Sequence, residues 1–206
     1  MSRLTLTSLA EGVGVLAARD PDLAGVVEQY GSPPLWGRDP GFATLLKIIL
    51  EQQVSLASAA AAYERLLDVL GSLTPGAFLA LDDTTLRRVG FSRQKTRYGR
   101  MLAEALLDGS LDLESIERLD DDQARESLTS LKGIGPWTAD TYLLMALGRP
   151  DVWPAGDIAL QAAVQDLKGR PARPSPDEMI ELAAPWRPWR AVAARILWFH
   201  YLGGQG

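Results

Sequence analysis

The sequence predicts an all-α protein of about ten helices, and two observations support this prediction. Apolar residues recur at helical spacing in several segments, whereas no stretch alternates apolar and polar residues as a half-buried strand would. Helix start and stop signals fall at the ends of these segments. At 206 residues the chain can bury a sizeable core, and we expect a single domain, residues 1–206, made of two helical lobes with a central cleft.

In the first half of the chain, Ser8 and Glu11 have the spacing of a capping box and predict a helix start. Apolar residues three and four positions apart then predict helices over residues 42–50 and 63–70. Helix ends are predicted at three glycines, Gly31, Gly71 and Gly90.

In the second half, the same periodicity predicts a helix over residues 139–147 that stops at Gly148. Ser175 and Glu178 form a second capping-box pattern, with Pro176 at the first helical position. Residues 191–202 are apolar almost all round, which predicts a central helix buried on several sides.

The composition excludes several kinds of chemistry. The chain has no cysteine, which rules out disulfides, a thiol nucleophile, cysteine zinc sites and iron–sulfur clusters. Its single histidine, His200, also leaves no histidine-rich metal site. No apolar run approaches the roughly 20 residues of a membrane span, and the start of the chain lacks the pattern of a secretory leader. We therefore expect a soluble, cytoplasmic protein with no membrane partner.

Charge is unevenly distributed along the chain. The net charge of −5 argues mildly against a nucleic-acid partner. Residues 87–100, however, contain six basic residues and no acidic one, whereas residues 104–126 contain nine acids. This pattern is compatible with a basic edge that binds phosphates and equally with a solvated helix face.

The most informative stretch, residues 128–160, predicts a helix, a tight turn, a second helix, a loop and an aspartate. Gly133 and Gly135 allow a sharp turn with no Cβ in the way, and Pro136 has its φ set for the start of the next helix. Such a turn leaves amides at a helix N-terminus, which can take a phosphate oxygen without reading base sequence.

The segment LKGIGPWTA, followed by Asp157, resembles the hairpin and aspartate of the helix-hairpin-helix (HhH-GPD) DNA glycosylase superfamily. The segments IILEQQVS, LRRVGFSRQKTRYG and WRPWRAVAARILWFHY resemble stretches of the 3-methyladenine DNA glycosylase II type in the same order. The resemblance runs from about residue 41 to residue 201, with the hairpin at about 124–147. It is to a short form without the N-terminal sheet domain of longer members.

The resemblance implies that Asp157 is the catalytic carboxylate. N-glycosidic cleavage passes through an oxocarbenium-like sugar cation, which a nearby carboxylate stabilises. Asp157 could also orient or deprotonate the attacking water. In the Ala155-Gly156-Asp157 context the same residue could cap the helix that starts at Ile158, and the two roles are compatible.

Three residues match family positions at the base pocket: Trp137, Trp198 and Gln52. An alkylated purine is cationic, so indole faces would attract it. Trp198 could equally serve core packing. The family's pocket tyrosine is replaced by Thr141, which leaves Tyr142 as a core candidate.

DNA contacts are implied at Gln53, which matches the position that fills the gap left by a flipped base, although a polar loop end would read the same way. Further contacts are implied along the hairpin, at Lys132, Gly133, Ile134, Gly135 and Thr138. The resemblance also implies a structural Na⁺ or K⁺ on the backbone carbonyls of Thr129, Leu131 and Ile134, and no catalytic cofactor.

Lyase members of the superfamily carry a lysine where this chain has Trp137, and Lys132 lies on the other side of the turn. The resemblance thus implies a monofunctional glycosylase that removes alkylated purines such as 3-methyladenine and 7-methylguanine in base excision repair, and it leaves etheno-adenine or hypoxanthine open as a further substrate. Its expected partner is double-stranded DNA with damaged bases, in the nucleoid, and we expect a monomer.

Three alternatives remain at this point: a non-catalytic DNA-binding hairpin module, a glycosylase for another damaged base, and a helical scaffold with no nucleic-acid role. The first has no need of Asp157 or the tryptophans. The second is kept open by Thr141 and Ile158, which make the pocket match incomplete. The third is favoured only by the acidic composition.

Overall fold

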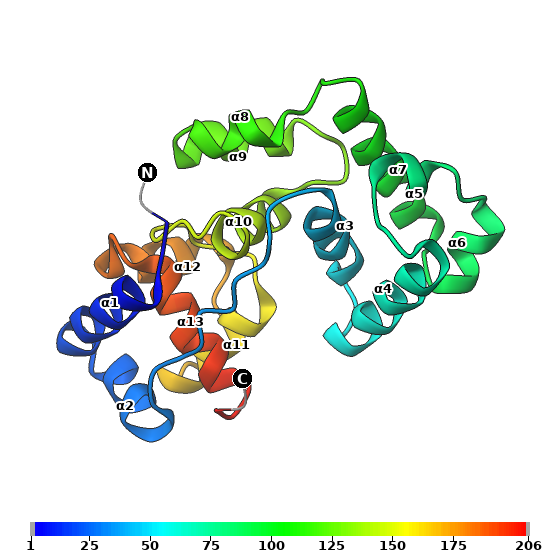
Figure 1. Ribbon diagram of the computed structural model, residues 1–206. Coiled ribbons are helices and arrows are strands. Elements are labelled where there is room, and N and C mark those ends of the chain that lie inside the picture. Colours follow the sequence, from blue (N-terminus) through cyan, green and yellow to red (C-terminus); the bar gives the residue numbers. More distant parts are fainter. Residues whose placement is uncertain (1–2, 205–206) are drawn as a thin grey trace. The chain divides into compact units, whose positions relative to one another are not determined.

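The computed structural model describes residues 3–204, and within that range the chain forms helices and no strand (Figure 1). The all-α prediction is confirmed. Thirteen α-helices and one 3-10 turn occur in this range, more than the sequence predicted. The additional helices are short, and five to seven residues are too few to show a periodic pattern: α5 (Pro75–Leu79), α6 (Asp83–Val89) and α8 (Leu113–Arg118).

The described chain divides into two compact units. The terminal unit, residues 3–37 and 148–204, contains α1 (Leu6–Arg19), α2 (Pro21–Tyr30), α11 (Ile158–Leu167), α12 (Pro176–Ala183), a 3-10 turn (Ala184–Trp186) and α13 (Arg190–Tyr201). The middle unit, residues 38–147, contains α3 (Phe42–Glu51), α4 (Leu56–Leu70), α5, α6, α7 (Arg93–Leu107), α8, α9 (Asp121–Thr129) and α10 (Pro136–Met145). Within residues 3–204, no helix combines the length and apolarity needed to cross a membrane.

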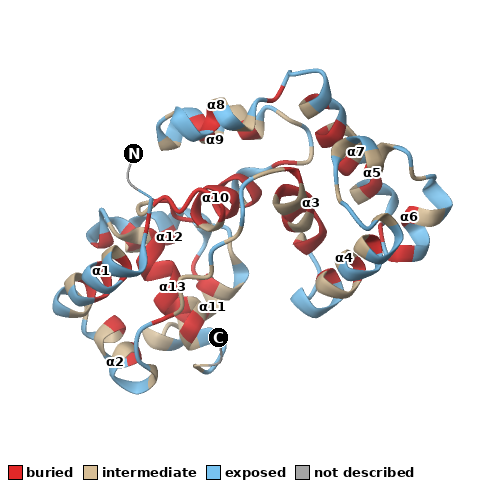
Figure 2. Cartoon of the chain, viewed as in Figure 1, coloured by how far each residue is buried: buried red, intermediate tan, exposed pale blue. Residues whose placement is uncertain are grey.

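Helix α13 forms the centre of the terminal unit. It packs against α1, α2 and α11, and its residues from Ala191 to Leu197 are buried (Figure 2). Arg195, which interrupts its apolar surface, is buried too and donates to the backbone carbonyls of Leu35 and Ala191. Burial lowers the pKa of Arg195 to about 10. The predicted central helix is therefore confirmed.

The middle unit is built around α3, whose buried face contacts α4, α7 and α10. Tyr142 of α10 is buried in this core and accepts a hydrogen bond from the Gly41 amide, and burial raises the pKa of its phenol to about 12. Tyr142 is thus the core residue that the sequence predicted.

Most helix ends lie where the sequence placed them, but α10 ends at Met145, before the predicted stop at Gly148. Gly31, Gly71 and Gly90 are C-caps, and Ser175 forms its capping box with Glu178. The predicted box at Ser8 and Glu11 is wrong: α1 is capped by Thr5, whose partner in the box is Ser8. Both hydroxyl residues can serve as the cap, so the helix begins one turn earlier than the pattern suggested.

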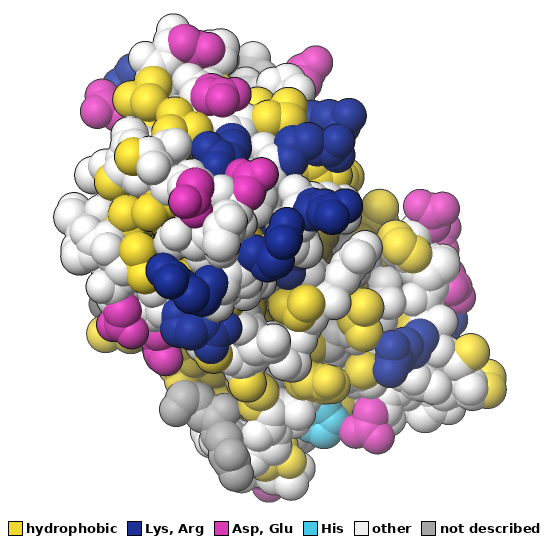
Figure 3. All heavy atoms as spheres, turned by 90° about the vertical axis from the view of Figure 1, so that its right-hand side faces the viewer, with side chains coloured by type: hydrophobic (Ala, Val, Ile, Leu, Met, Phe, Trp, Pro, Cys, Tyr) yellow, Lys and Arg dark blue, Asp and Glu magenta, His cyan; other side chains and the backbone are white. Residues whose placement is uncertain are grey.

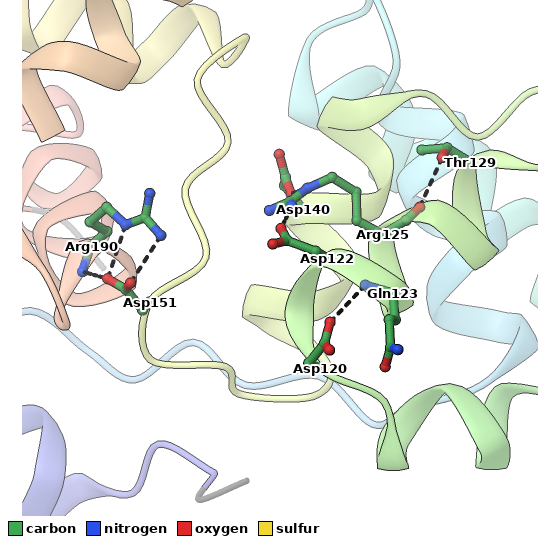
Figure 4. A network of polar contacts seen from close by, with 8 residues as sticks. All are labelled: Asp120, Asp122, Gln123, Arg125, Thr129, Asp140, Asp151 and Arg190. Atoms are coloured by element: carbon green, nitrogen blue, oxygen red, sulfur yellow. Dashed lines mark hydrogen bonds and ion pairs between the residues drawn. The ribbon is translucent and has the colours of Figure 1, made fainter. Parts of the chain in front are cut away.

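A buried ion pair fixes α9 against α10. Arg125 of α9 donates through Nε to the Asp140 carboxylate of α10 at 2.6 Å and through Nη1 to the exposed Asp122 at 2.8 Å (Figure 4). These carboxylates raise the pKa of Arg125 from its ordinary value although burial opposes them. The pair thus links the two helices that flank the hairpin turn.

In the terminal unit, Arg190 forms a bidentate ion pair with Asp151 (Figure 4).

We expect Asp140→Ala to lower the free energy of unfolding by about 3 kcal/mol, because it leaves the half-buried guanidinium of Arg125 without its buried partner. Asp122→Ala removes the exposed partner of the same arginine and should cost less than about 1 kcal/mol. Urea unfolding followed by circular dichroism measures both. If the two variants lost the same free energy of unfolding, burial of the carboxylate would not determine how much each ion pair stabilises the protein.

Candidate functional site

The candidate catalytic carboxylate, Asp157, is the N-cap of α11 in the terminal unit. A tight turn precedes it, in which the Asp157 amide donates to the Pro154 carbonyl. Its Oδ1 atom accepts the Leu160 amide at 2.9 Å, which satisfies one of the unpaired N–H groups at the helix start. The capping role anticipated from the local sequence is therefore present.

Trp198 lies directly beside this carboxylate. Its indole Nε1–H donates to Asp157 Oδ1 at 3.1 Å, from the neighbouring helix α13, which packs on α11. Both side chains are half-buried, so each keeps some exposed surface. Two donors on one oxygen hold the carboxylate in a single orientation. The structure therefore places Trp198, a predicted pocket residue, in contact with the predicted catalytic residue.

The predicted hairpin lies in the middle unit, between α9 and α10. Gly133 has φ +103, and a Cβ built there would be 2.4 Å from the Tyr98 ring, so both backbone and packing require glycine. The prediction for Gly135 needs correction. Its φ is −92, it is the N-cap of α10, and an added Cβ would meet nothing within 4 Å. The fold itself does not require glycine at that position.

The N-terminus of α10 has no side-chain cap, and Pro136 occupies its first turn as predicted. Lys132 is exposed in the turn and Trp137 is half-buried in the first turn of α10. Ile134 and Thr138 are buried, at 3% and 2% exposed. Their side chains therefore pack inside the protein, and the expected DNA contact at these two positions is limited to the backbone.

Gln52 links the end of α3 to the hairpin. Its Nε2 atom donates to the Gly133 carbonyl and to the Thr138 hydroxyl, both at 2.9 Å. Both amide hydrogens are thus used inside the middle unit. The structure gives this predicted pocket residue a second role, because it ties the turn to the loop that carries Gln53.

Gln53 is exposed and has φ +56, a left-handed conformation that is uncommon outside glycine. Lys95 of α7 supports the same loop, donating through Nζ to the Leu50 carbonyl in the last turn of α3 at 2.5 Å, and burial lowers its pKa. Backbone strain of this kind gathers at functional sites, where surrounding contacts maintain it. Lys95 and Tyr98 both fall in the basic stretch of residues 87–100, but the local sequence does not indicate the contacts that they make.

The three carbonyls assigned to a cation come from one short stretch. Thr129 ends α9, so its carbonyl is in the last turn, which lacks helical donors. The Leu131 carbonyl accepts the Ile134 amide at 3.0 Å and keeps a second lone pair. Neutral carbonyl oxygens of this kind are suitable ligands for K⁺ or Na⁺.

Asp157 and Trp198 belong to the terminal unit, whereas Gln52, Gln53, Trp137 and the hairpin belong to the middle unit.

Comparison with known proteins gives relatives over most of the chain. DNA-3-methyladenine glycosylase 1 of Schizosaccharomyces pombe is 30% identical over 161 residues, which cover 76% of this chain and 71% of that protein. DNA-3-methyladenine glycosylase of Bacillus subtilis is 26% identical over 195 residues, which cover 89% of this chain and 64% of that protein. The chain spans 64%, 59% and 64% of the lengths of three of the curated relatives that it matches.

Solved structures show the same fold. The Schizosaccharomyces pombe 3-methyladenine DNA glycosylase Mag1, in complex with abasic DNA, superposes with a TM-score of 0.86 at 27% identity, over 92% of this chain and 95% of that one. A DNA-3-methyladenine glycosidase from Bacillus halodurans gives a TM-score of 0.75 at 31% identity, over 92% and 88%.

A family model described as the HhH-GPD superfamily base excision DNA repair protein matches residues 46–188, which include the hairpin and Asp157. The chain belongs to the HhH-GPD superfamily of base excision DNA repair proteins.

Proposed function

We propose that the protein is a DNA glycosylase that hydrolyses the N-glycosidic bond of alkylated purines in double-stranded DNA. The observation that supports this proposal most strongly is the Asp157 carboxylate, held by the Leu160 amide and the Trp198 indole. A non-catalytic hairpin module has no need of a carboxylate oriented from two sides. The relatives named as 3-methyladenine glycosylases support the choice of substrate.

In this proposal, Asp157 stabilises the positive charge that develops on the sugar as the base departs. The two donors occupy Oδ1 and hold the carboxylate against rotation, so its charge needs little reorganisation in the transition state. Asp157 also orients the attacking water, which adds to the sugar carbon while the base leaves with the glycosidic electron pair.

Trp198, beside Asp157, is proposed to bind the base, and Trp137 of the middle unit is proposed to do so on the strength of its match to a family pocket position alone. A purine alkylated on a ring nitrogen is cationic and a good leaving group, so the pocket needs electron-rich faces rather than a strong acid. Each indole face contributes roughly 0.5 to 2 kcal/mol to the binding of such a cation. Trp198 would serve two purposes, with its ring toward the base and its N–H on Asp157.

The hairpin amides of the α10 N-terminus are proposed to hold a backbone phosphate, with Lys132 beside them. A Na⁺ or K⁺ on the carbonyls of Thr129, Leu131 and Ile134 would be structural and would offset phosphate charge there. Gln53, kept in its strained conformation by the anchored loop, would fill the space left by the extruded base.

We further propose that the enzyme has no lyase activity, because Trp137 stands where lyase members carry the nucleophilic lysine. An alkylated duplex incubated with wild-type protein should release free methylated purines and leave alkali-labile but unbroken strands. Strands broken without alkali would show lyase chemistry, and no released base would refute the glycosylase proposal. A Trp137→Lys variant provides the matched comparison for strand breakage.

A further inference from the structure

A group of polar side chains from α7 lies against the hairpin turn in the middle unit. We call Gln94, Arg97 and Tyr98 the Tyr98 cluster, and Lys132 lies in the adjacent hairpin turn. The contact is close, because a Cβ at Gly133 would be 2.4 Å from Tyr98 Cγ and 2.7 Å from Cδ1. The phenol ring therefore occupies the space that Gly133 leaves open. Tyr98 is thus a direct neighbour of the turn whose amides are proposed to bind phosphate.

The Tyr98 hydroxyl accepts a hydrogen bond from within the cluster. Gln94 Nε2 donates to Tyr98 Oη at 2.8 Å, and the Arg97 guanidinium lies over the Tyr98 ring, 5.5 Å from its centroid. Donation from Gln94 lowers the pKa of Tyr98 from its ordinary value, and Arg97 and Lys132 act in the same direction. Since the Gln94 amide donates to this oxygen, the phenolic hydrogen remains available for an acceptor outside the cluster.

The cluster and the adjacent Lys132 also carry positive charge. Arg97 and Lys132 are exposed, and neither takes part in the ion pairs found within residues 3–204. Figure 3, which faces the side of the middle unit formed by α4 to α7, shows Lys and Arg side chains close together on its surface. Two cations and a phenolic donor on one edge match the chemistry of a phosphodiester.

We propose that the Tyr98 cluster binds a second DNA backbone phosphate, beside the one held by the hairpin amides. This proposal rests on the proposed function and extends its DNA-contacting surface from the hairpin onto α7. The Tyr98 hydroxyl donates to a phosphate oxygen, and Arg97 supplies the charge. Because these groups meet the backbone and not the base edges, the contact positions the duplex without selecting its sequence.

The test measures equilibrium binding of an undamaged duplex at several salt concentrations. Arg97→Gln should reduce the slope of log K against log salt by about 0.9, as expected for one phosphate no longer neutralised. Tyr98→Phe keeps the ring against Gly133 and removes only the hydroxyl, so it should weaken binding about tenfold with the slope unchanged. Lys132→Gln, within the hairpin, should reduce the slope by about the same amount as Arg97→Gln.

Arg118→Gln is the matched control, because Arg118 is an exposed arginine of the same unit, on α8. It should leave the slope unchanged. Wild-type affinity and slope in both Arg97→Gln and Tyr98→Phe would overturn the proposal, as would an equal change in Arg118→Gln. If Lys132→Gln lowers the slope while the α7 variants do not, the hairpin contact stands and only the cluster proposal fails. Glycosylase activity is judged separately, by base release from alkylated DNA.

Discussion

Replacing Asp157 by asparagine is expected to lower the single-turnover rate of base release about a thousandfold while leaving the fold and the affinity for duplex DNA intact. Asparagine retains an oxygen that can accept from the Leu160 amide and from Trp198, and it caps helices as well as aspartate does. The substitution therefore removes the negative charge alone. Rates are measured with enzyme in excess over an alkylated duplex, so that product release does not enter.

Asp157→Ala separates the two roles of this residue. It should lose base release to a similar extent and, in addition, about 1 kcal/mol of stability, because the α11 cap is lost. Comparing the melting temperatures of Asp157→Asn and Asp157→Ala then separates the catalytic effect of the charge from the stabilising effect of the helix cap. If asparagine kept near-wild-type turnover, the carboxylate would not be the catalyst. If it lost turnover only through unfolding, its melting temperature would fall as far as that of the alanine variant.

Gly133→Ala is expected to weaken binding of damaged and undamaged duplexes alike, by about 10- to 100-fold. A side chain at φ +103 costs about 1 to 3 kcal/mol, and its Cβ would clash with the Tyr98 ring. The turn must then relax to another conformation, and the fraction of molecules with a binding-competent hairpin falls accordingly. Fluorescence anisotropy with both kinds of duplex measures this loss.

Gly135→Ala is the control for this substitution, since its φ is −92 and its Cβ would meet open space. Its stability should stay within about 0.5 kcal/mol of wild type. A Gly133→Ala/Tyr98→Ala double variant should recover stability relative to Gly133→Ala, because the clash is relieved. Equal stability losses at Gly133 and Gly135 would contradict the distinction that the structure draws between the two glycines.

Sequence patterns predicted the features that are set by residues close together in the chain, namely the long helices and several of their ends. The long helices α3, α4, α10 and α13 followed from apolar periodicity, and the start of α12 from its capping box. Short helices could not be predicted in this way. At α1, Thr5 and Ser8 are both suitable cap residues, and the structure uses Thr5.

The contacts that shape the candidate site join residues distant in sequence, so no local pattern encodes them. Trp198 and Asp157 are 41 positions apart and meet because α13 packs on α11. Gln52 reaches the hairpin across 81 positions. Likewise, the sequence could mark residues 87–100 as basic, but the contact of Tyr98 with Gly133 depends on how α7 packs in the middle unit.

The most direct test of the central claim is chromatographic identification of the bases released from a methylated duplex by wild type and by Asp157→Asn, each at saturating concentration. The account predicts free methylated purines from wild type and none above background from the variant. Release of the same bases by both proteins would contradict the role of Asp157, and release by neither would contradict the assignment of glycosylase activity to this chain.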